Sequence, residues 1–408
     1  MNLIGADYLL LCDDAFSVIE KGGILFCKDR IIEVGDYVLL EHKAKNKKYY
    51  NNCVITPGLC NLHMHLEFNQ NNGILEYGSF GKWLDSVIKN REKMMDEKLE
   101  SSMQEGIKEI LRSGVAFVGA ISSHGYDLQI LKNSPLRVMY FNEVIGSKAE
   151  LLDVFLANFK ARFEDSSAFA DERFYPSVAI HSPYSVHSKL LEKALEITKC
   201  EKTPLSVHFL ESKEEKEWLE NSSGYFAEFY AKFFQTKMET FYSIESFMRK
   251  FEDLSPYFVH CLEMGEKELK LLKNMQGKII SCPRSNRLLN NKLLDLDLIK
   301  KEGFNPIFAT DGKSSNASLS ILDELRVALF AYVNSDLESL AKELFLGVTN
   351  YAYKDNVLGL KGGILKKDYF ADFAVFAYEG KKEQIALQLI LYAKEAKALY
   401  IAGEEISL

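Results

Sequence analysis

The sequence predicts an α/β fold: a (β/α)8, TIM-like barrel with a small β-sandwich beside it. Two observations favour this fold class. About eight short apolar runs alternate with longer helical segments through the middle of the chain, and both ends consist of short runs separated by turns. A chain of 408 residues with 47% apolar side chains is also long enough to bury so large a core.

The two ends of the chain are expected to pair with each other. Residues 1–56 hold short apolar runs broken by "DD", "KGG" and "KDR", and after "LGLKGGILKKDYFADFAVF" the chain returns to short strands. We therefore assign residues 1–56 and 360–408 to a composite β-sandwich, and residues 57–359 to the barrel domain.

The barrel strands are expected at eight apolar runs, separated by helical stretches such as residues 86–111 and 189–200. The segment 211–256 is long for a single connection and contains the aromatic-rich "GYFAEFYAKFF", so we expect it to form part of the wall over the barrel mouth. In chain order the strand candidates are "VITPGLCNLHMH", "GVAFVGAISSH", "PLRVMYFNEV", "YPSVAIHS", "PLSVHFLE", "YFVHC", "KIISCPRS" and "NPIFATDG".

Composition argues against several classes of partner. Lys and Arg total 50 against 58 Asp and Glu, a net charge of −8, and no block of basic residues is present that would neutralise phosphates. The N-terminal "MNLIGADYLLLCDD" lacks a basic region before its apolar run, and no apolar stretch reaches membrane-spanning length. Seven cysteines without a C-x-x-C pattern are typical of a reducing compartment. We expect a cytoplasmic protein that binds neither nucleic acid nor membrane.

Histidines gather where a barrel enzyme builds its site. Six of the eight are expected at or near the C-terminal ends of barrel strands, the face on which loops and inward side chains converge. His63 and His65 are two residues apart on one strand, so their imidazoles point to the same side, either as buried aromatic groups or as a pair of metal ligands. The six are His63, His65, His124, His181, His208 and His260; the role of His124 is left open.

An aspartate at the end of the eighth strand favours the metal. Asp311 follows the apolar run "PIFAT" and precedes glycine, a position where a carboxylate is costly unless it is paired or coordinated. Together with His63, His65 and His208 it gives three imidazoles and one carboxylate. That set suits one Zn²⁺ or Fe²⁺ with a position left for water.

Five motifs resemble a known family along nearly the whole chain. They resemble the amidohydrolase superfamily, in its mononuclear nucleoside and nucleobase deaminase branch. The resemblance implies that His63, His65, His208 and Asp311 bind the metal. Strand four carries His181 in place of the lysine that bridges two ions in binuclear relatives, which agrees with a single ion. The motifs are "PGLCNLHMHLE", "VHFLESKEE", "VHC", "SCPRSNRLL" and "ATDGKSSNASLSILDELR".

The resemblance also implies a catalytic pair, Glu211 and His260. A metal ion lowers the pKa of a bound water to about 7, so hydroxide forms at neutral pH. His260 would accept or orient that water's proton, and Glu211 would protonate the ring nitrogen beside the attacked carbon. The tetrahedral centre would then expel ammonia, with Asp311 as the proton donor to the leaving amino group.

Further stretches indicate the substrate. "YGSFGKWLDSVI", "FNEVIGS" and "AIHSPYSVHSKLL" resemble the aminofutalosine deaminases, which convert 6-amino-6-deoxyfutalosine to futalosine in menaquinone biosynthesis. The expected partner is thus a small adenine nucleoside, with a homodimer as the default assembly. Alternatives with the same mechanism are deamination of adenosine, 5′-methylthioadenosine, S-adenosylhomocysteine or guanine, and hydrolysis of a chlorinated triazine. A non-enzymatic barrel would have lost metal ligands, which this sequence keeps.

Several residues are candidates for substrate contact. Phe80 and Trp83 could supply flat apolar surface to a ring, or simply pack at helical spacing. Glu143, just after strand three, could accept ribose hydroxyls, and His181 aligns with a substrate-contacting histidine of the family. Arg137 precedes strand three, where it is compatible with a carboxylate partner or a surface charge, and it is not assigned.

Overall fold

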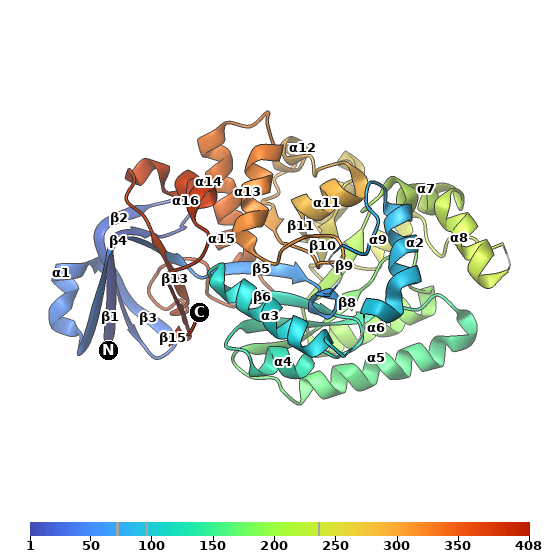
Figure 1. The fold of residues 1–408 in the computed structure, drawn as a ribbon. Helices are drawn as coiled ribbons and strands as arrows, with labels where there is room; N and C mark the ends of the chain where they lie inside the picture. Colours follow the sequence, from blue (N-terminus) through green and yellow to red (C-terminus); the bar gives the residue numbers. More distant parts are fainter. Residues whose placement is uncertain (71–72, 95–96, 236) are drawn as a thin grey trace.

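The structure is a computed structural model that describes residues 1–408 except 71–72, 95–96 and 236. It contains two sheets, an eight-stranded barrel and a seven-stranded sheet built from both ends of the chain. The seven-stranded terminal sheet lies at one end of the barrel, and β5 points away from it (Figure 1). The carboxyl ends of the barrel strands therefore open on the far side of the molecule.

The barrel is parallel throughout and buried on both faces. Every residue of β6 and β7 is buried, which explains why these strands read as continuous apolar runs. Each strand pairs with its neighbour in chain order. The strands are β5 (Leu59–Met64), β6 (Val115–Ser122), β7 (Arg137–Val144), β8 (Phe174–Ile180), β9 (Leu205–Phe209), β10 (Tyr257–His260), β11 (Lys278–Ser281) and β12 (Ile307–Phe308).

A side-chain bridge spans the seam between the last and first barrel strands. β12 is two residues long and pairs with β11. Beyond it, the Thr310 N–H donates to Asn61 Oδ1 at 3.0 Å, and Asn61 Nδ2 donates to Thr310 Oγ1 at 2.7 Å. The Asp311 N–H then donates to the His63 carbonyl at 3.0 Å. These contacts bring the end of the eighth strand against the histidine strand.

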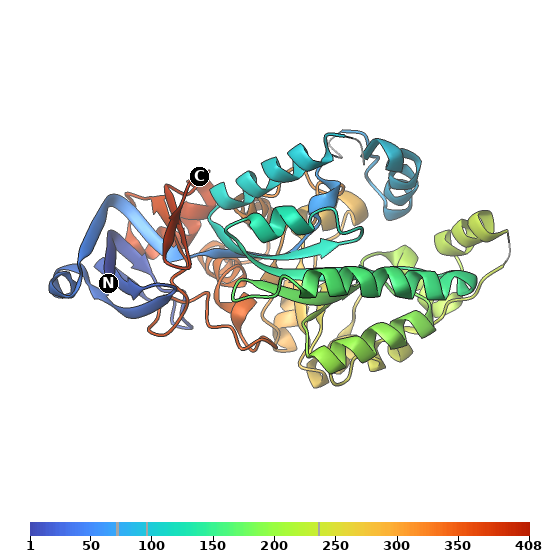
Figure 2. The ribbon, with the colours of Figure 1, turned by 90° about the horizontal axis from the view of Figure 1, so that it is seen from below.

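Helices surround the barrel and extend over its mouth. Figures 1 and 2 place α2 and α8 at the end away from the terminal sheet, with α5 and α6 along the side of the barrel. The helices of this part are α2 (Phe80–Asn90), α3 (Leu99–Arg112), α4 (Leu128–Asn133), α5 (Leu152–Ser167), α6 (Ser188–Glu201), α7 (Lys213–Asn221), α8 (Tyr225–Phe234), α9 (Ile244–Arg249), α10 (Glu266–Asn274), α11 (Pro283–Asn290), α12 (Leu296–Lys301), α13 (Ile321–Ala331), α14 (Leu337–Gly347) and α15 (Asn350–Tyr353).

The two ends of the chain share the terminal sheet, as the sequence predicts. β13 pairs antiparallel with β4, so a C-terminal strand continues the N-terminal sheet. The C-terminal segment also contains a helix, α16 (Ile385–Tyr392), which packs against α13 and α14 of the barrel. The strands in sheet order are β15 (Glu404–Ile406), β14 (Ala398–Ile401), β13 (Phe373–Ala377), β4 (Asn46–Pro57), β1 (Asn2–Leu10), β2 (Val18–Cys27) and β3 (Arg30–Asp36); α1 (Tyr37–Leu40) follows β3.

Two predicted elements are divided in the structure. The run "VITPGLCNLHMH" is not one strand, because β4 ends at Pro57 in the terminal sheet and β5 begins at Leu59 in the barrel. Gly58 between them allows the close passage, since a Cβ there would lie 2.6 Å from Ala116 Cβ. The helical stretch predicted over residues 86–111 is two helices, α2 and α3, with the short 3-10 helix η3 (Arg91–Met94) after α2.

Arg137 forms a buried ion pair where the barrel meets the terminal sheet. Its side chain is fully buried, which excludes the surface charge that the sequence allowed for Arg137. The guanidinium donates from Nε to Asp372 Oδ2 at 2.5 Å and from Nη2 to Asp372 Oδ1 at 3.2 Å. It also lies 3.7 Å from the ring centroid of Phe370. Arg137 begins β7, at the end of the barrel opposite the mouth, so it cannot reach a substrate there.

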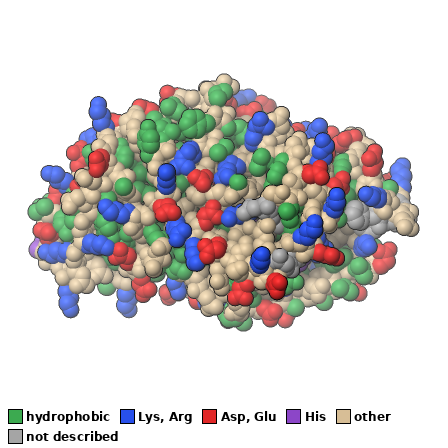
Figure 3. All heavy atoms as spheres, viewed as in Figure 1, with side chains coloured by type: hydrophobic (Ala, Val, Ile, Leu, Met, Phe, Trp, Pro, Cys, Tyr) green, Lys and Arg blue, Asp and Glu red, His purple; other side chains and the backbone are tan. Residues whose placement is uncertain are grey.

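The surface carries charges of both signs. Figure 3 shows Lys and Arg side chains interspersed with Asp and Glu over the face in view. Among the described residues, no helix combines the length and the apolar character needed to cross a membrane.

Candidate active site

Histidines from four barrel strands and the aspartate after the eighth meet at the barrel mouth. His63 lies in β5 and His65 directly follows it, while His208 lies in β9 and His260 ends β10. His181 follows β8. The predicted strand-end positions of these side chains are therefore those of the structure.

Each of the four predicted metal ligands lies close to at least one other. Asp311 Oδ1 is 3.6 Å from His63 Nε2 and 3.4 Å from His65 Nε2. His65 Nε2 and His208 Nε2 are 3.3 Å apart. Ligand atoms of His63, His65 and Asp311 form one candidate metal-binding group, and those of His63, His208 and His260 form a second that shares His63.

The donor set fits one ion. His63 is fully buried, and neither ring nitrogen has a hydrogen-bond partner among the described residues. His208 Nδ1 lies 2.8 Å from the His181 carbonyl, so it carries the proton and leaves the Nε2 lone pair facing His65. Burial lowers the pKa of His63, of His208 and of His65, the last to about 4, and neutral imidazole is the form that binds metals. Buried nitrogens without hydrogen-bond partners that face one carboxylate suit a bound cation.

Asp311 is held in a strained conformation by its neighbours. Its φ of 60° lies in the left-handed region, which costs a non-glycine residue about 1–3 kcal/mol and persists where surrounding contacts fix it. Ser285 Oγ and Ser315 Oγ each donate to Asp311 Oδ2 at 2.7 Å. Oδ1 accepts the Gly312 N–H at 2.8 Å and faces His63 and His65, so its second lone pair remains for an ion. Burial opposes ionisation, but His63 and His65 outweigh it and hold the pKa of Asp311 well below its usual value.

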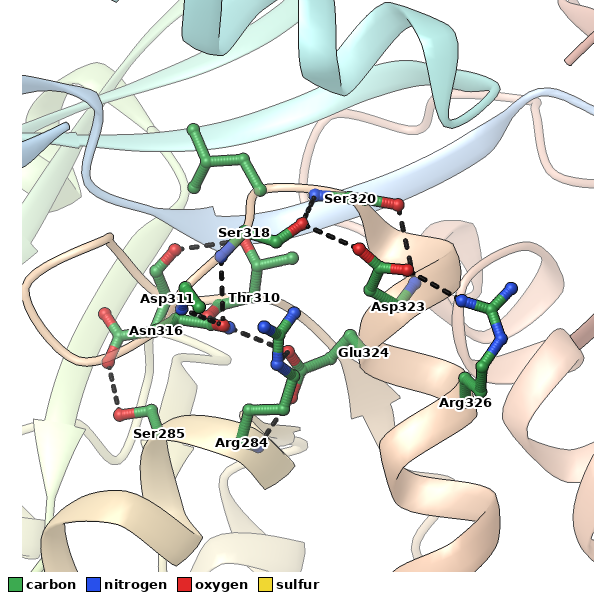
Figure 4. A network of polar contacts seen from close by, with 12 residues as sticks. Arg284, Ser285, Thr310, Asp311, Asn316, Ser318, Ser320, Asp323, Glu324 and Arg326 are labelled. Atoms are coloured by element: carbon green, nitrogen blue, oxygen red, sulfur yellow. Dashed lines mark hydrogen bonds and ion pairs between the residues drawn. The ribbon is translucent and has the colours of Figure 1, made fainter. Parts of the chain in front are cut away.

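A second layer of contacts supports this aspartate loop (Figure 4). Asn316 Nδ2 donates to the Thr310 carbonyl at 2.6 Å and to Glu324 Oε2 at 2.8 Å. Glu324 Oε1 accepts the Arg284 N–H at 2.7 Å, which ties the loop to the start of α11. Gly312 is required next to Asp311, because a Cβ there would lie 2.8 Å from His65 Cβ.

Glu211 is placed over the ligands by a second glutamate. Glu215 accepts the Leu210 N–H at 2.9 Å and the Glu211 N–H at 3.0 Å, and so fixes the turn after β9. Glu211 is 6% exposed, and burial together with Asp311 raises its pKa well above the usual value. A carboxyl in this position can hold a proton and deliver it to a bound molecule.

His260 faces Glu211 from β10. Its Nε2 is 3.7 Å from Glu211 Oε1, and its Nδ1 is 2.8 Å from Asn286 Oδ1. The Nδ1–H therefore donates to the amide oxygen, which leaves the unprotonated Nε2 as the nitrogen that faces the site. His260 has a φ of 71°, a second strained backbone position at the mouth.

Glu143 and His181 lie beside the ligands on the substrate side. Glu143 lies inside β7, one residue before its end and not after the strand as predicted, and is 1% exposed. Its Oε2 accepts the Ser123 hydroxyl at 2.5 Å, and its Oε1 has no hydrogen-bond partner among the described atoms. Burial opposes ionisation, but His181 and His65 outweigh it and lower the pKa of Glu143. His181 Nδ1 contacts Ser185 Oγ at 2.7 Å, which leaves Nε2 available. Both residues can therefore offer a free polar atom to a ligand.

The predicted aromatic residues form a wall above the site. Phe80 is buried and packs 5.5 Å from Trp83 and 6.2 Å from Tyr184 and from Phe226 of α8, measured between ring centroids. Trp83 is part-exposed and donates from Nε1 to the Ser314 carbonyl at 2.8 Å. Phe80 thus packs within the wall, and Trp83 is the more accessible of the two rings. Segment 211–256 contributes α8 to this wall.

Glu67 is the functional-site residue that the sequence reasoning missed. It is fully buried, and its carboxylate accepts backbone N–H groups of Ser123, His124 and Tyr126 at 2.7 to 3.2 Å. Burial and the nearby Asp127 raise its pKa to about 8. The sequence could have identified Glu67. It is a carboxylate in an apolar run, two residues after "HMH", where it is costly unless it is paired, and the same argument identified Asp311.

A parallel barrel with three buried histidines and an aspartate at its carboxyl end defines a metal-dependent hydrolase of the barrel type. The chain belongs to the amidohydrolase family, whose model matches residues 54–406.

Three proteins of known name are similar to this chain over at least 95% of its length. An aminodeoxyfutalosine deaminase of Nitratiruptor sp. is 41% identical over 394 residues, covering 95% of this chain and 96% of that protein. An adenosine deaminase of Helicobacter pylori is 38% identical over 413 residues, covering 99% of each. The crystal structure of Helicobacter pylori aminofutalosine deaminase in complex with methylthio-coformycin superimposes with a TM-score of 0.94 at 36% identity, covering 100% of both chains.

Proposed function

We propose that this chain hydrolyses the 6-amino group of 6-amino-6-deoxyfutalosine, releasing futalosine and ammonia. The observation that carries the proposal is the buried cluster of His63, His65, His208 and Asp311 with Glu211 and His260 against it. The 41% identical aminodeoxyfutalosine deaminase supports the choice of substrate.

His63, His65, His208 and Asp311 would hold one divalent ion, Zn²⁺ or Fe²⁺, since both accept imidazole and carboxylate ligands. When bound, such an ion acidifies a coordinated water and so provides a nucleophile at neutral pH.

The protein groups would handle the protons of the reaction. His260 Nε2 can accept a proton from the attacking water, because Asn286 occupies its Nδ1. Glu211 delivers a proton to N1 of the adenine as the water oxygen bonds to C6. The ionised Asp311 would accept the proton of the hydroxyl formed at C6 and pass it to the amino group, which leaves as ammonia as the C6–N6 bond breaks. The proton held by His260 would return to Glu211, whose Oε1 is 3.7 Å from Nε2. The purine is left with a carbonyl at C6.

The substrate side would bind the sugar and the ring. Glu143 Oε1 would accept ribose hydroxyls and His181 would donate to a ribose oxygen or to the reacting centre. Trp83, backed by Phe80, would offer flat apolar surface to a ring.

The proposal also covers the pathway, the cellular compartment, the oligomeric state and the domain bounds. We place the enzyme in menaquinone biosynthesis by the futalosine route and, because all seven cysteines are free thiols, in the reducing cytoplasm, as a homodimer. We keep residues 57–359 as the barrel domain and residues 1–56 with 360–408 as the second domain.

Deamination of adenosine or 5′-methylthioadenosine is the second candidate. It is favoured by the 38% identical relative named adenosine deaminase, which this chain covers almost completely. The same metal site and proton transfers would serve these substrates.

A substrate panel separates the two candidates. Metal-loaded protein is given 6-amino-6-deoxyfutalosine, adenosine, 5′-methylthioadenosine, S-adenosylhomocysteine and guanine, and kcat/KM is measured from ammonia release. We expect 6-amino-6-deoxyfutalosine among the best substrates. If it ranks below adenosine and methylthioadenosine, the specific assignment fails while the deaminase class stands.

A further inference from the structure

The Glu143 carboxylate lies inside the barrel, near its mouth. Phe141, two residues earlier on β7, belongs to the apolar cluster in which residues of several barrel strands meet, and side chains alternate along a strand, so Glu143 is the next residue on that face. Val144, which follows Glu143, accepts the His181 N–H at 3.0 Å. The His181 carbonyl in turn lies 2.8 Å from Nδ1 of the ligand His208. These two bonds place Glu143 beside the strand end that supports a metal ligand.

The Ser123 hydroxyl fixes the orientation of this carboxylate. It donates to Oε2 at 2.5 Å, whereas Oε1 has no hydrogen-bond partner among the described atoms. The last torsion of a glutamate side chain has broad preferences, so rotamer preference alone does not decide which oxygen faces a ligand. A hydroxyl has a single proton, and here Oε2 accepts it. Ser123 thus sets the plane of the carboxylate and leaves Oε1 for a bound molecule.

The backbone of Ser123 and Glu143 is held by contacts that do not involve this hydroxyl. The Ser123 N–H donates to the buried Glu67 Oε2 at 2.7 Å. From α5, Arg162 donates from Nη1 to the Ser122 carbonyl at 2.9 Å and from Nη2 to the Glu143 carbonyl at 2.6 Å. Removing the Ser123 hydroxyl should therefore release the carboxylate while the two strand ends keep their positions.

We propose that Ser123 is a positioning residue that makes Glu143 selective for a ribose hydroxyl. The inference rests on the proposed function, in which Oε1 accepts that hydroxyl. A ribose O–H donates to the carboxylate, whereas a deoxyribose leaves Oε1 buried without a donor. The enzyme should therefore reject the 2′-deoxy or the 3′-deoxy substrate, according to which hydroxyl faces Oε1. Without the Ser123 hydroxyl the carboxylate can turn away from the sugar, and this discrimination weakens.

The test combines matched substrates with a double-mutant cycle. The substrates are 6-amino-6-deoxyfutalosine and its 2′-deoxy and 3′-deoxy analogues. Ser123→Ala removes the hydroxyl, Glu143→Met keeps the chain length but removes the acceptor oxygens, and a double variant combines the two changes. For each protein, kcat/KM on the parent substrate divided by kcat/KM on each analogue gives the ribose preference.

Ser134→Ala is the matched control. Ser134 is half-buried like Ser123, and its hydroxyl donates to the Leu131 carbonyl at 2.7 Å. It lies between α4 and β7, at the end of the barrel opposite the mouth. The control therefore removes a comparable hydrogen bond without touching the site.

We expect the wild type to prefer the parent over one analogue by at least about 10-fold, and Ser123→Ala to lose most of that preference. Ser134→Ala should keep the wild-type ratio. Adding Ser123→Ala to Glu143→Met should change the ratio no further, because the serine acts through the carboxylate.

Several outcomes would overturn the inference. If Ser123→Ala keeps the wild-type ratio, or lowers it by the same factor in the Glu143→Met background, the serine does not act through Glu143, while the proposed reaction stands. An equal loss on all three substrates keeps the ratio and has the same meaning. Turnover of the parent by the wild type without any ribose preference would remove Glu143 as the ribose acceptor. Absence of turnover of the parent by the metal-loaded wild type would refute the proposed function, and the inference with it.

Discussion

Replacing Arg137 with methionine should destabilise the protein without altering the site. The methionine fills much of the volume of the arginine stem but leaves Asp372 buried without its cation. Asp372 Oδ1 keeps the Ala402 N–H at 2.7 Å, whereas Oδ2 loses the 2.5 Å bond from Nε. Breaking one partner of a buried ion pair costs about 3–5 kcal/mol, because the remaining charge is uncompensated.

The expected shift in Tm follows from the size of the chain. For 408 residues, an unfolding entropy of about 2.1 cal/mol/K per residue makes 3–5 kcal/mol correspond to a fall of roughly 3–6 °C if the whole chain unfolds together. Differential scanning calorimetry measures this shift. Below the transition, kcat/KM should be unchanged, because Arg137 lies at the end of the barrel opposite the site.

Two further variants complete the measurement. Arg173→Met removes an exposed arginine near the same end of the barrel and should change the unfolding free energy by less than about 0.5 kcal/mol. Adding Asp372→Asn to Arg137→Met removes the orphaned charge and should recover part of the loss. A fall in Tm of less than about 1 °C for Arg137→Met would refute the assignment of Arg137 and Asp372 as a stabilising ion pair.

Three other perturbations test the site. Glu211→Gln should lower kcat at least about 100-fold while metal analysis still finds one ion per chain; full activity would exclude proton delivery by this carboxyl. Glu215→Ala should leave the Leu210 and Glu211 N–H groups without an acceptor, lower the unfolding free energy by about 2–5 kcal/mol and reduce kcat, and kinetics equal to wild type would show that the turn holds its shape without it. Dialysis against a chelator should abolish turnover and lower Tm, with Zn²⁺ or Fe²⁺ restoring both; an unchanged Tm and activity would contradict the ligand set.

Much of the barrel could be predicted because its signals are local. Strands buried on both faces read as apolar runs, and polar residues that end such runs must serve a purpose there. This reasoning placed His63 and Asp311 at one end of the barrel, and the structure brings their side chains to 3.6 Å. The same reasoning applied to Glu67 would have identified the anchor of the loop after β6.

The ends of the strands and helices were harder to predict, because the apolar pattern does not show where the chain passes from one sheet to another. Apolar residues continue from β4 through Gly58 into β5, so one run serves two sheets. The break between α2 and α3 has no proline or glycine to announce it. Tertiary packing decides both points, since each segment turns to meet a different neighbour.

By itself, the sequence determined the fold class, the strand ends and the convergence of His63, His65, His208 and Asp311 at those ends. These depend on the alternation of strands and helices and on the cost of burying polar groups. Only the tertiary structure decided which partner each group has. Arg137 and Asp372 are 235 positions apart, and the carboxylate that fixes His124 lies 57 residues before it. A charge can be paired by any opposite charge that the fold brings near, so the sequence names the groups and the fold selects the pairs.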